Sequence, residues 1–415
     1  MTPEIKQRIE QIRRGEVPEG YVKTALGLAP ANWKRYTFGD IYTERKEPGD
    51  ENLPLLMVSI HSGVSDGEVD AAELPKQVKR IEDKSQYKKA VSGDLVFNMM
   101  RAWQGAIGTV RTTGMVSPAY IVAEPNDKAY PLFMDYYSRT PQMINQIDRQ
   151  SYGVTDFRKR LYWDSFAPIS CTLPPIEEQQ KIATILTTQD RVIELKEKRL
   201  AEKQRQKKYL MQQLLTGKKR LPGFNGAWKT DCLGKLFFER KETNCENIEM
   251  LAITGTQGII PRKELDLKDN SSEDKSKYLR VCVGDIGYNT MRMWQGVSAY
   301  SNYEGIVSPA YTILKPSSSI NAKYFAYLFK MSEIVFLFYR FSQGLVDDTR
   351  NLKYENFKKI KVCYPPDMKE QTAIAEVLSA ADREIDLLQQ DIEQEKQKKK
   401  ALMQLLLTGI VRVKT

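Results

Sequence analysis

The sequence is poor in the residues on which most catalytic centres depend. It has one histidine, His61, so a serine–histidine or cysteine–histidine nucleophile would rest on that residue alone. Its five cysteines are scattered and form no CxxC pair, which excludes a zinc ribbon or finger and favours reduced thiols. The segments GxxxxGKS/T, HExxH and NPPY/F, signatures of a phosphate loop, a zinc metalloprotease and an adenine methyltransferase, are also absent. We therefore expect a chain that is not an enzyme.

Long hydrophobic runs are lacking too, and the first residues do not have the pattern of a signal peptide, so we expect a soluble, cytoplasmic protein. Apolar residues nevertheless make up 41% of the 415 residues, which is enough for two or more folded domains. Lys and Arg exceed Asp and Glu by 63 to 53. The resulting net charge of +10 is compatible with nucleic-acid binding but does not require it.

The chain contains a duplicated unit. The segment MMRAWQG at 99–105 recurs as TMRMWQG at 290–296, and these copies lie 191 residues apart. Three further pairs of similar segments keep nearly the same offset, at 115–120 with 306–311, at 33–46 with 228–241, and at 210–217 with 402–409. Similarity over this much of the chain indicates two copies of one structural unit.

Each copy has a mixed part followed by a helical part. Short apolar runs between turn residues indicate strands, and a helical stretch follows each SPAY segment at about 131–149 and 321–340, so we predict an α+β domain in each copy. A stretch without Pro or Gly then predicts a long helix. The predicted ranges are a lead-in at 1–32, a first domain at 33–176, a first helix at 177–217, a second domain at 218–366, and a second helix with the tail at 367–415.

Apolar residues in both predicted long helices are spaced by alternating steps of three and four, the pattern of a coiled-coil seam. About 40 residues at ~1.5 Å each would make a rod of roughly 60 Å. A lone amphipathic helix of that length cannot bury its own stripe, and the other copy is the obvious partner. The seam is also the predicted partner-binding surface, through Ile182, Leu186, Ile193, Ile374, Leu378 and Ile385.

The helical parts resemble a known family. PPIEEQQKIATIL, leading on to LMQQLLTGKKRLPGF, looks like the first spacer-helix region of type I restriction–modification specificity subunits, and PPDMKEQTAIAEVL with KKKALMQLLLTG resembles the second. The segment ALGLAPANWKRYTFGDI at 25–41 is similar to the lead-in of the first target-recognition domain in that family. The resemblance covers essentially the whole chain.

This resemblance implies an α+β fold with two target-recognition domains separated by two long antiparallel coiled-coil helices and related by a pseudo-two-fold axis. Each domain would read one half of a bipartite site in double-stranded DNA, and the helices would set the spacer. Two methyltransferase and two restriction/translocase subunits would be the partners, and S-adenosylmethionine, ATP and Mg would bind to them and not to this chain. A tandem regulator, a fused restriction enzyme and a coiled-coil assembly protein are the rival interpretations.

The MRxWQG segment is one candidate DNA contact. Arginine and glutamine contact guanine and adenine edges bidentately and also bind phosphates, although here they could equally serve a structural role. Two domains that read different half-sites should share their scaffold, so the common Trp and Gly are predicted to be structural. The candidate contacts are Arg101, Gln104, Arg292 and Gln295.

Two segments that differ between the copies are the candidate base readers. His61 and Ser62 align with Thr256 and Gln257, each pair just before a shared glycine. Further on, the basic run of copy one aligns with a segment whose only basic residue is an arginine, and the candidates there are Arg158, Lys159, Arg160 and Arg350. Ordinary divergence of loops after a duplication is the alternative explanation for both.

Overall fold

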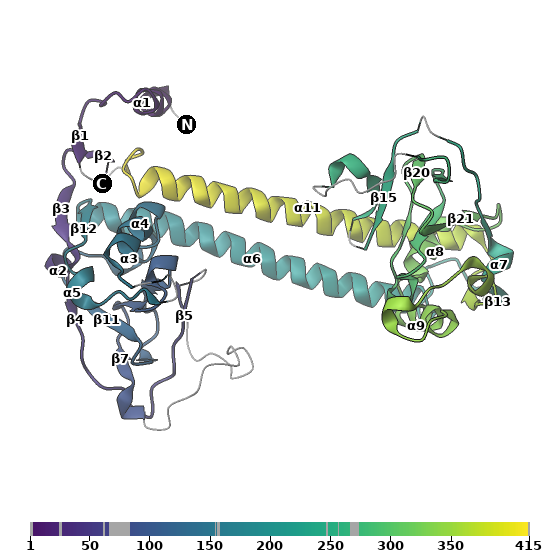
Figure 1. Ribbon diagram of the computed structural model, residues 1–415, viewed down its shortest axis with the longest axis horizontal. Coiled ribbons are helices and arrows are strands. Elements are labelled where there is room, and N and C mark those ends of the chain that lie inside the picture. Colours follow the sequence, from purple (N-terminus) through teal and green to yellow (C-terminus); the bar gives the residue numbers. More distant parts are fainter. Residues whose placement is uncertain are drawn as a thin grey trace. The chain divides into compact units, whose positions relative to one another are not determined.

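The structure of the chain is a computed structural model that describes residues 3–24, 27–60, 63–65, 84–153, 155, 158–245, 248–255, 257–265 and 274–413 (Figure 1). The chain divides into two compact units. Unit 1 comprises Met1–Leu195 with Ile392–Thr415, and unit 2 comprises Lys196–Asp391. The boundary crosses both long helices, so each unit holds one part of α6 (Ile176–Leu214) and one part of α11 (Met368–Leu406). No described helix is long and apolar enough to cross a membrane.

The same antiparallel strand order builds both units. A four-stranded sheet in unit 1 has the order β4 (Tyr42–Glu44), β11 (Tyr120–Pro125), β8 (Leu95–Asn98) and β9 (Ile107–Thr109). Its counterpart in unit 2 is β14 (Phe237–Glu239), β21 (Tyr311–Pro316), β18 (Ile286–Asn289) and β19 (Ser298–Tyr300). The predicted α+β fold and internal repeat are therefore confirmed.

Short strand pairs complete the two units, and all but one of the described pairs have an equivalent in the other unit. A pair that joins the two ends of each domain consists of β3 (Lys34–Thr37) with β12 (Ser170–Leu173) in unit 1, and β13 (Lys229–Cys232) with β22 (Lys361–Tyr364) in unit 2. The remaining pairs are β1 (Tyr21–Thr24) with β2 (Gly27–Pro30), β7 (Lys88–Ala90) with β10 (Gly114–Val116), β17 (Leu279–Val281) with β20 (Gly305–Val307), β5 (Val58–Ser59) with β6 (Gly63–Val64), and β15 (Leu251–Thr254) with β16 (Gly258–Pro261).

The predicted helical stretch after each SPAY segment is present and consists of two short helices. In unit 1, α3 (Pro131–Tyr137) and α4 (Pro141–Gln150) are separated at Thr140, which is extended because a proline follows it and whose side chain caps α4. In unit 2, α8 (Ala322–Leu328) and α9 (Ser332–Phe341) are separated at the same place without a proline. There Met331 is the extended residue before α9, and the side chains of Phe329 and Met331 are buried on either side of the break.

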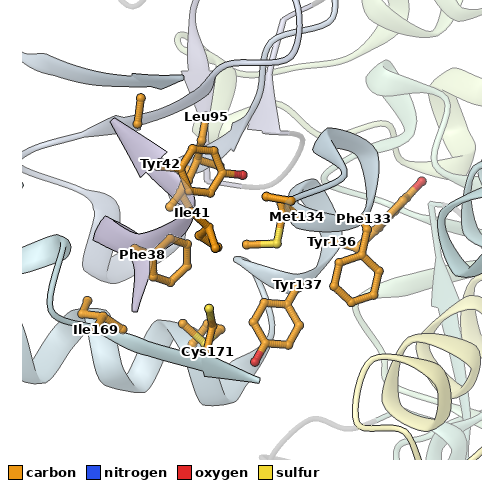
Figure 2. Packing of buried hydrophobic residues seen from close by; sticks show 14 of the residues in the cluster. Phe38, Ile41, Tyr42, Leu95, Phe133, Met134, Tyr136, Tyr137, Ile169 and Cys171 are labelled. Atoms are coloured by element: carbon orange, nitrogen blue, oxygen red, sulfur yellow. The ribbon is translucent and has the colours of Figure 1, made fainter. Parts of the chain in front are cut away.

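The main core of each unit lies between the sheet, the short helices and the two long helices. In unit 1, Phe38 and Tyr42 pack with Met134 and Tyr137, and Figure 2 shows these side chains pointing toward one another. The long helices close this core with Ile182, Ala183, Leu186, Leu406 and Leu407. Unit 2 uses the opposite ends of the same helices, through Leu214, Leu215, Ile374, Ala375 and Leu378. Each helix therefore belongs to both cores.

Polar contacts show that the helices run antiparallel within each unit. In unit 1, Gln189 of α6 donates to Glu395 of α11 at 2.6 Å. In unit 2, Lys196 pairs with Asp391 at 2.8 Å, and Lys203, further along α6, pairs with Glu384, earlier in α11, at 2.8 Å. The residue numbers rise along one helix as they fall along the other, as in an antiparallel pair.

A buried carboxylate–guanidinium joint fastens the start of each long helix to the chain that leaves the other. Glu178, 1% exposed, accepts two hydrogen bonds of 2.7 Å from Arg412, which follows α11. Glu370, 2% exposed, accepts bonds of 2.6 and 2.7 Å from Arg220, which follows α6. Both arginines come three residues after a glycine, Gly409 or Gly217, whose positive φ ends the helix.

A second repeated contact, the tyrosine clamp, ties each domain to both long helices. The Tyr136 hydroxyl of α3 donates to Asp190 of α6 at 2.6 Å, and Lys399 of α11 binds the same carboxylate at 2.5 Å. Burial and the neighbouring carboxylate raise the pKa of Tyr136, so the phenol stays a proton donor. The clamp in unit 2 is Tyr327, Asp382 and Lys207.

We predict that Arg412→Ala destabilises unit 1. The substitution leaves the Glu178 carboxylate buried with only a 3.4 Å bond from Trp33, and removing one partner of a buried pair costs about 3 kcal/mol. Hydrogen exchange of the amides in β11 and α3 should report the lower opening free energy. Arg191→Ala is the control, because its pair with Glu194 is exposed and contributes under about 1 kcal/mol. Equal protection in the two variants would contradict the role of the joint.

Candidate nucleic-acid interface

A tight turn with the sequence MRxWQG follows an inner strand of each four-stranded sheet. After β8, the Asn98 side chain accepts a bond from the Met100 amide at 2.8 Å, and the Trp103 indole donates to the Met100 carbonyl at 3.0 Å. Gly105 closes the turn at φ 105°, where only glycine is unstrained. The same bonds and glycine conformation recur after β18 at Asn289, Met291, Trp294 and Gly296.

This geometry buries the glycine, half-buries the tryptophan and leaves the arginine and glutamine exposed in both units. Among the described residues, Arg101 and Arg292 have no ion pair or side-chain hydrogen bond, and Gln104 and Gln295 have none either. No described carboxylate therefore accounts for these arginines. Within the described part of the chain, both guanidinium groups are exposed and without an acceptor.

A second loop lies against the turn in unit 1. Tyr152 and Arg160 exchange backbone hydrogen bonds of 3.1 and 3.0 Å that close this loop, and the Leu161 amide binds the Met99 carbonyl at 2.9 Å. Lys159 sits over the Trp103 ring, 4.9 Å from its centroid, and pairs with Asp148 of α4 at 2.8 Å. Of the remaining candidates here, Arg158 is exposed and Arg160 is half-buried.

Unit 2 has the equivalent loop with different chemistry. Gln343 and Asn351 close it with two backbone bonds of 2.8 Å, and the Leu352 amide binds the Thr290 carbonyl at 2.8 Å. Arg350 lies over the Tyr339 ring, 4.1 Å from its centroid, and donates to Asp347 at 2.9 Å. Tyr339 in turn packs edge-on against Trp294, with the ring centroids 6.2 Å apart. The bond to Asp347 raises the pKa of Arg350, which therefore remains a cation.

A hairpin brings a third segment to the turn in each unit. In unit 1 a Cβ on Gly105 would lie 3.5 Å from the carbonyl oxygen of Ile60, at the end of β5. In unit 2 a Cβ on Gly255 would lie 4.0 Å from Val297, which follows the turn. The hairpin candidates His61, Ser62 and Thr256 lie outside the described residues, whereas Gln257 is described and exposed.

The structure thus brings three separately predicted segments together in each unit: the MRxWQG turn, the hairpin and the loop. They are up to about 100 positions apart in the chain, and neither periodicity nor composition relates them. Tyr339, which links the turn to the loop, was missed. The signal that could have found it is the repeat itself, since Asp148 and Tyr339 occupy equivalent positions, as do Lys159 and Arg350.

The seam residues assigned to partner binding need a correction. All six are buried by the chain itself, at 8% exposure or less: Ile182, Leu186, Ile193, Ile374, Leu378 and Ile385. Four of them form part of the cores of the two units, because each long helix packs against a domain as well as against its partner helix. These six side chains are therefore not an exposed surface for a further subunit.

Lys330 is another residue that sequence patterns did not single out. Its ammonium donates to the carbonyl of Gly296, at the end of the turn, at 2.8 Å. Burial of the ammonium, with a smaller contribution from Lys207, lowers the pKa of Lys330 to about 8. This hydrogen bond stabilises the end of the turn.

The described residues contain no group of His, Cys, Asp and Glu that could hold a metal ion.

Comparison with known proteins identifies a family. Residues 72–205 and 234–397, more than half of the chain, match the type I restriction modification DNA specificity domain. A putative type I restriction enzyme MjaX specificity subunit from Methanocaldococcus jannaschii is 24% identical over 446 aligned positions, which cover 96% of this chain and 98% of the relative.

Two solved structures share the fold. The S subunit of a type I restriction–modification system from M. genitalium is 13% identical, with a TM-score of 0.54 over 92% of this chain and 97% of that one. A chain from a study of complex assembly and conformational transition of the type I R-M system is 17% identical, with a TM-score of 0.50 over 92% and 99%. With the two matched segments, these findings show that the chain belongs to the family of type I restriction–modification specificity subunits, which are non-catalytic DNA-recognition subunits.

Proposed function

We propose that the chain reads a bipartite site in double-stranded DNA, with one half-site for each unit. The observation that carries the proposal is the pair of equivalent, exposed arginines, Arg101 and Arg292, which no described carboxylate neutralises. Arginine binds phosphates and contacts guanine bidentately. Each arginine lies beside a hairpin and a loop whose residues differ between the units. A shared frame with different loops is what two readers of different half-sites require.

The two kinds of residue take different tasks in this proposal. The turn residues contact DNA in the same way in both units, and they are Arg101 with Gln104 and Arg292 with Gln295. Through the sugar–phosphate backbone of the DNA, they fix the orientation of each unit on the duplex. The residues that differ read bases, and these are His61, Ser62, Thr256, Gln257, Arg158, Lys159, Arg160 and Arg350. Lys159 and Arg350 are already held by side chains of α4 and α9, so they approach DNA as oriented donors.

The chain would act as part of a larger complex. We propose two methyltransferase subunits and two restriction/translocase subunits as its partners, with S-adenosylmethionine, ATP and Mg bound to them. The chain's own lack of methyltransferase and phosphate-loop segments supports this division. Because its substrate would be the chromosome, the complex would act in the cytoplasm. The methyltransferase subunits would dock on the outward faces of α6 and α11.

The first prediction concerns the two arginines. Arg101→Ala and Arg292→Ala should each weaken binding to the cognate duplex by about 1–3 kcal/mol if the guanidinium contacts a base, and by less if it contacts a phosphate. A salt titration separates the two cases, since a lost phosphate contact lowers the slope of log affinity against log salt by about 1. Arg205→Ala, which removes an exposed arginine of α6, is the matched control. Affinity that is unchanged or falls equally in all three variants would remove the turn from the interface.

The second prediction concerns independence of the two readers. Segment 34–173 begins on β3 and ends on β12, which are paired, so its ends are neighbours and it can be exchanged for the same segment of another family member. The hybrid, expressed with its partner subunits, should methylate a site with one new half and one unchanged half. Methylome sequencing gives the result directly. A change in both halves, in a hybrid that folds, would show that the units do not read separately.

The third prediction concerns the spacer. Both helices are continuous across the unit boundary, so we propose that their length sets the distance between half-sites. Four residues inserted after Leu195 and four after Asp391 add about 6 Å and about 40° of rotation. One base pair adds about 3.4 Å and about 35°. The unread spacer should lengthen by one or two base pairs while both half-sites keep their sequences. An unchanged spacer in the methylome would refute the role of helix length.

A further inference from the structure

The loop of unit 2 exposes a large apolar side chain completely. Leu345 is 99% exposed and its neighbour Val346 is 59% exposed. Among the described residues, the next most exposed large apolar side chain is Leu387 of α11, at 65%. Exposed leucines are common on protein surfaces, but a leucine that projects fully from a loop tip buries no apolar area and so contributes nothing to the stability of the fold.

Backbone hydrogen bonds and a tightly packed glycine support the loop that carries Leu345. Paired backbone bonds of 2.8 Å between Gln343 and Asn351 close its base. Gly344 has φ +137°, and a Cβ there would lie 2.6 Å from the Thr349 carbonyl oxygen, so no other residue fits without movement. On the other side of the tip, the Thr349 amide bonds the Val346 carbonyl at 3.0 Å. The leucine therefore projects from a supported turn.

The loop is also fastened to the DNA-binding turn. Arg350 bonds the Tyr339 hydroxyl at 3.0 Å, and Tyr339 packs against Trp294. Two residues beside this tryptophan, Arg292 and Gln295, are exposed and have no described partner. The loop with the apolar tip and the turn with the exposed cation and amide are thus linked by direct contacts.

We propose that Leu345 is a wedge that inserts between two stacked base pairs in the half-site read by unit 2. Leucine is among the side chains that enter a base step in this way, and the cation beside it binds the phosphates of the same step. The cost of opening a step depends on its sequence and is lowest at pyrimidine–purine steps. Leu345 would therefore select a flexible step without hydrogen-bonding to any base.

A protein pocket is the other conceivable occupant, and the small apolar area of the loop disfavours it. A stable protein interface needs a broad apolar centre, whereas here the apolar surface of the loop is confined to two adjacent side chains at a tip. A single side chain is sufficient for a wedge. The inference rests on the proposed function, because it assumes that unit 2 contacts DNA.

The test uses the full chain in complex with its methyltransferase subunits and duplexes that contain the mapped site. Fluorescent 2-aminopurine replaces each adenine in turn, and pyrrolocytosine each cytosine, so that every base pair of the second half-site and its flanks is probed except the methylated adenine. Specific binding of the wild type is measured first against a scrambled duplex. We expect the fluorescence of the probe at one base step to rise severalfold when the wild-type complex binds, because the base there is unstacked. The same probe should stay quenched with Leu345→Ala and should become fluorescent again with Leu345→Met.

Val283→Ala is the matched control, since it removes another exposed apolar side chain of unit 2, 62% exposed before β18 and away from both long helices, and should leave the signal unchanged. Site affinity should fall severalfold with Leu345→Ala alone. If the wild type binds specifically but no step brightens, or if brightening survives in Leu345→Ala, the wedge is wrong and DNA reading stands. If Leu345→Ala instead weakens subunit assembly and bound complexes brighten normally, the leucine fills a protein pocket. Failure of the wild type to prefer its site would overturn both proposals.

Discussion

The buried carboxylate–guanidinium joint is the constraint on which both units depend. Glu178 and Glu370 stand at the starts of the long helices and are almost completely shielded from water, so the loss of either arginine would leave a buried carboxylate without its main partner, which is costly. Each arginine arrives from the chain that leaves the other helix. The joint therefore forms only when the start of one helix lies beside the end of the other. An antiparallel arrangement follows in each unit, and with it the helix residues that close each core.

The tyrosine clamp adds a different constraint. Its three side chains come from a domain helix, from the long helix that follows that domain, and from the opposite long helix, and they meet on one carboxylate in each unit. A domain that tilted on the helices would leave Asp190 or Asp382 with an incomplete set of donors. Because the joint orders the helices and the clamp orders the domain on them, the turn at Arg101 or Arg292 is presented in a fixed direction relative to the helix axis.

The repeat explains why so much of this could be predicted from the sequence. Segments that recur, such as MRxWQG and LMQxLLTG, are those whose geometry both units need: a turn closed by a left-handed glycine, and a helix end closed in the same way. The burial of Ile182 and Leu378 by the domains was missed, because periodicity shows that a stripe is apolar but not what covers it. The Glu178–Arg412 joint was missed for a related reason: it spans 234 positions, and no local pattern relates its ends.

The two loops carry different side chains on one shared frame. At equivalent positions unit 1 has Asp148 with Lys159, an ion pair that places the ammonium over Trp103, and unit 2 has Tyr339 with Arg350, a stacked pair that reaches Trp294. The acidic residue and the lysine of unit 1 are replaced together by the tyrosine and the arginine of unit 2. Each pair therefore still contacts the tryptophan of its turn, while the exposed surface of the loop differs. In unit 1 the loop offers further positive charge from Arg158, whereas in unit 2 it offers an apolar tip. Charge favours the phosphate-lined grooves and an apolar tip favours a deformable base step. Matched exchanges of this kind, and changes at loop tips, alter the exposed surface without removing the contacts between loop and turn.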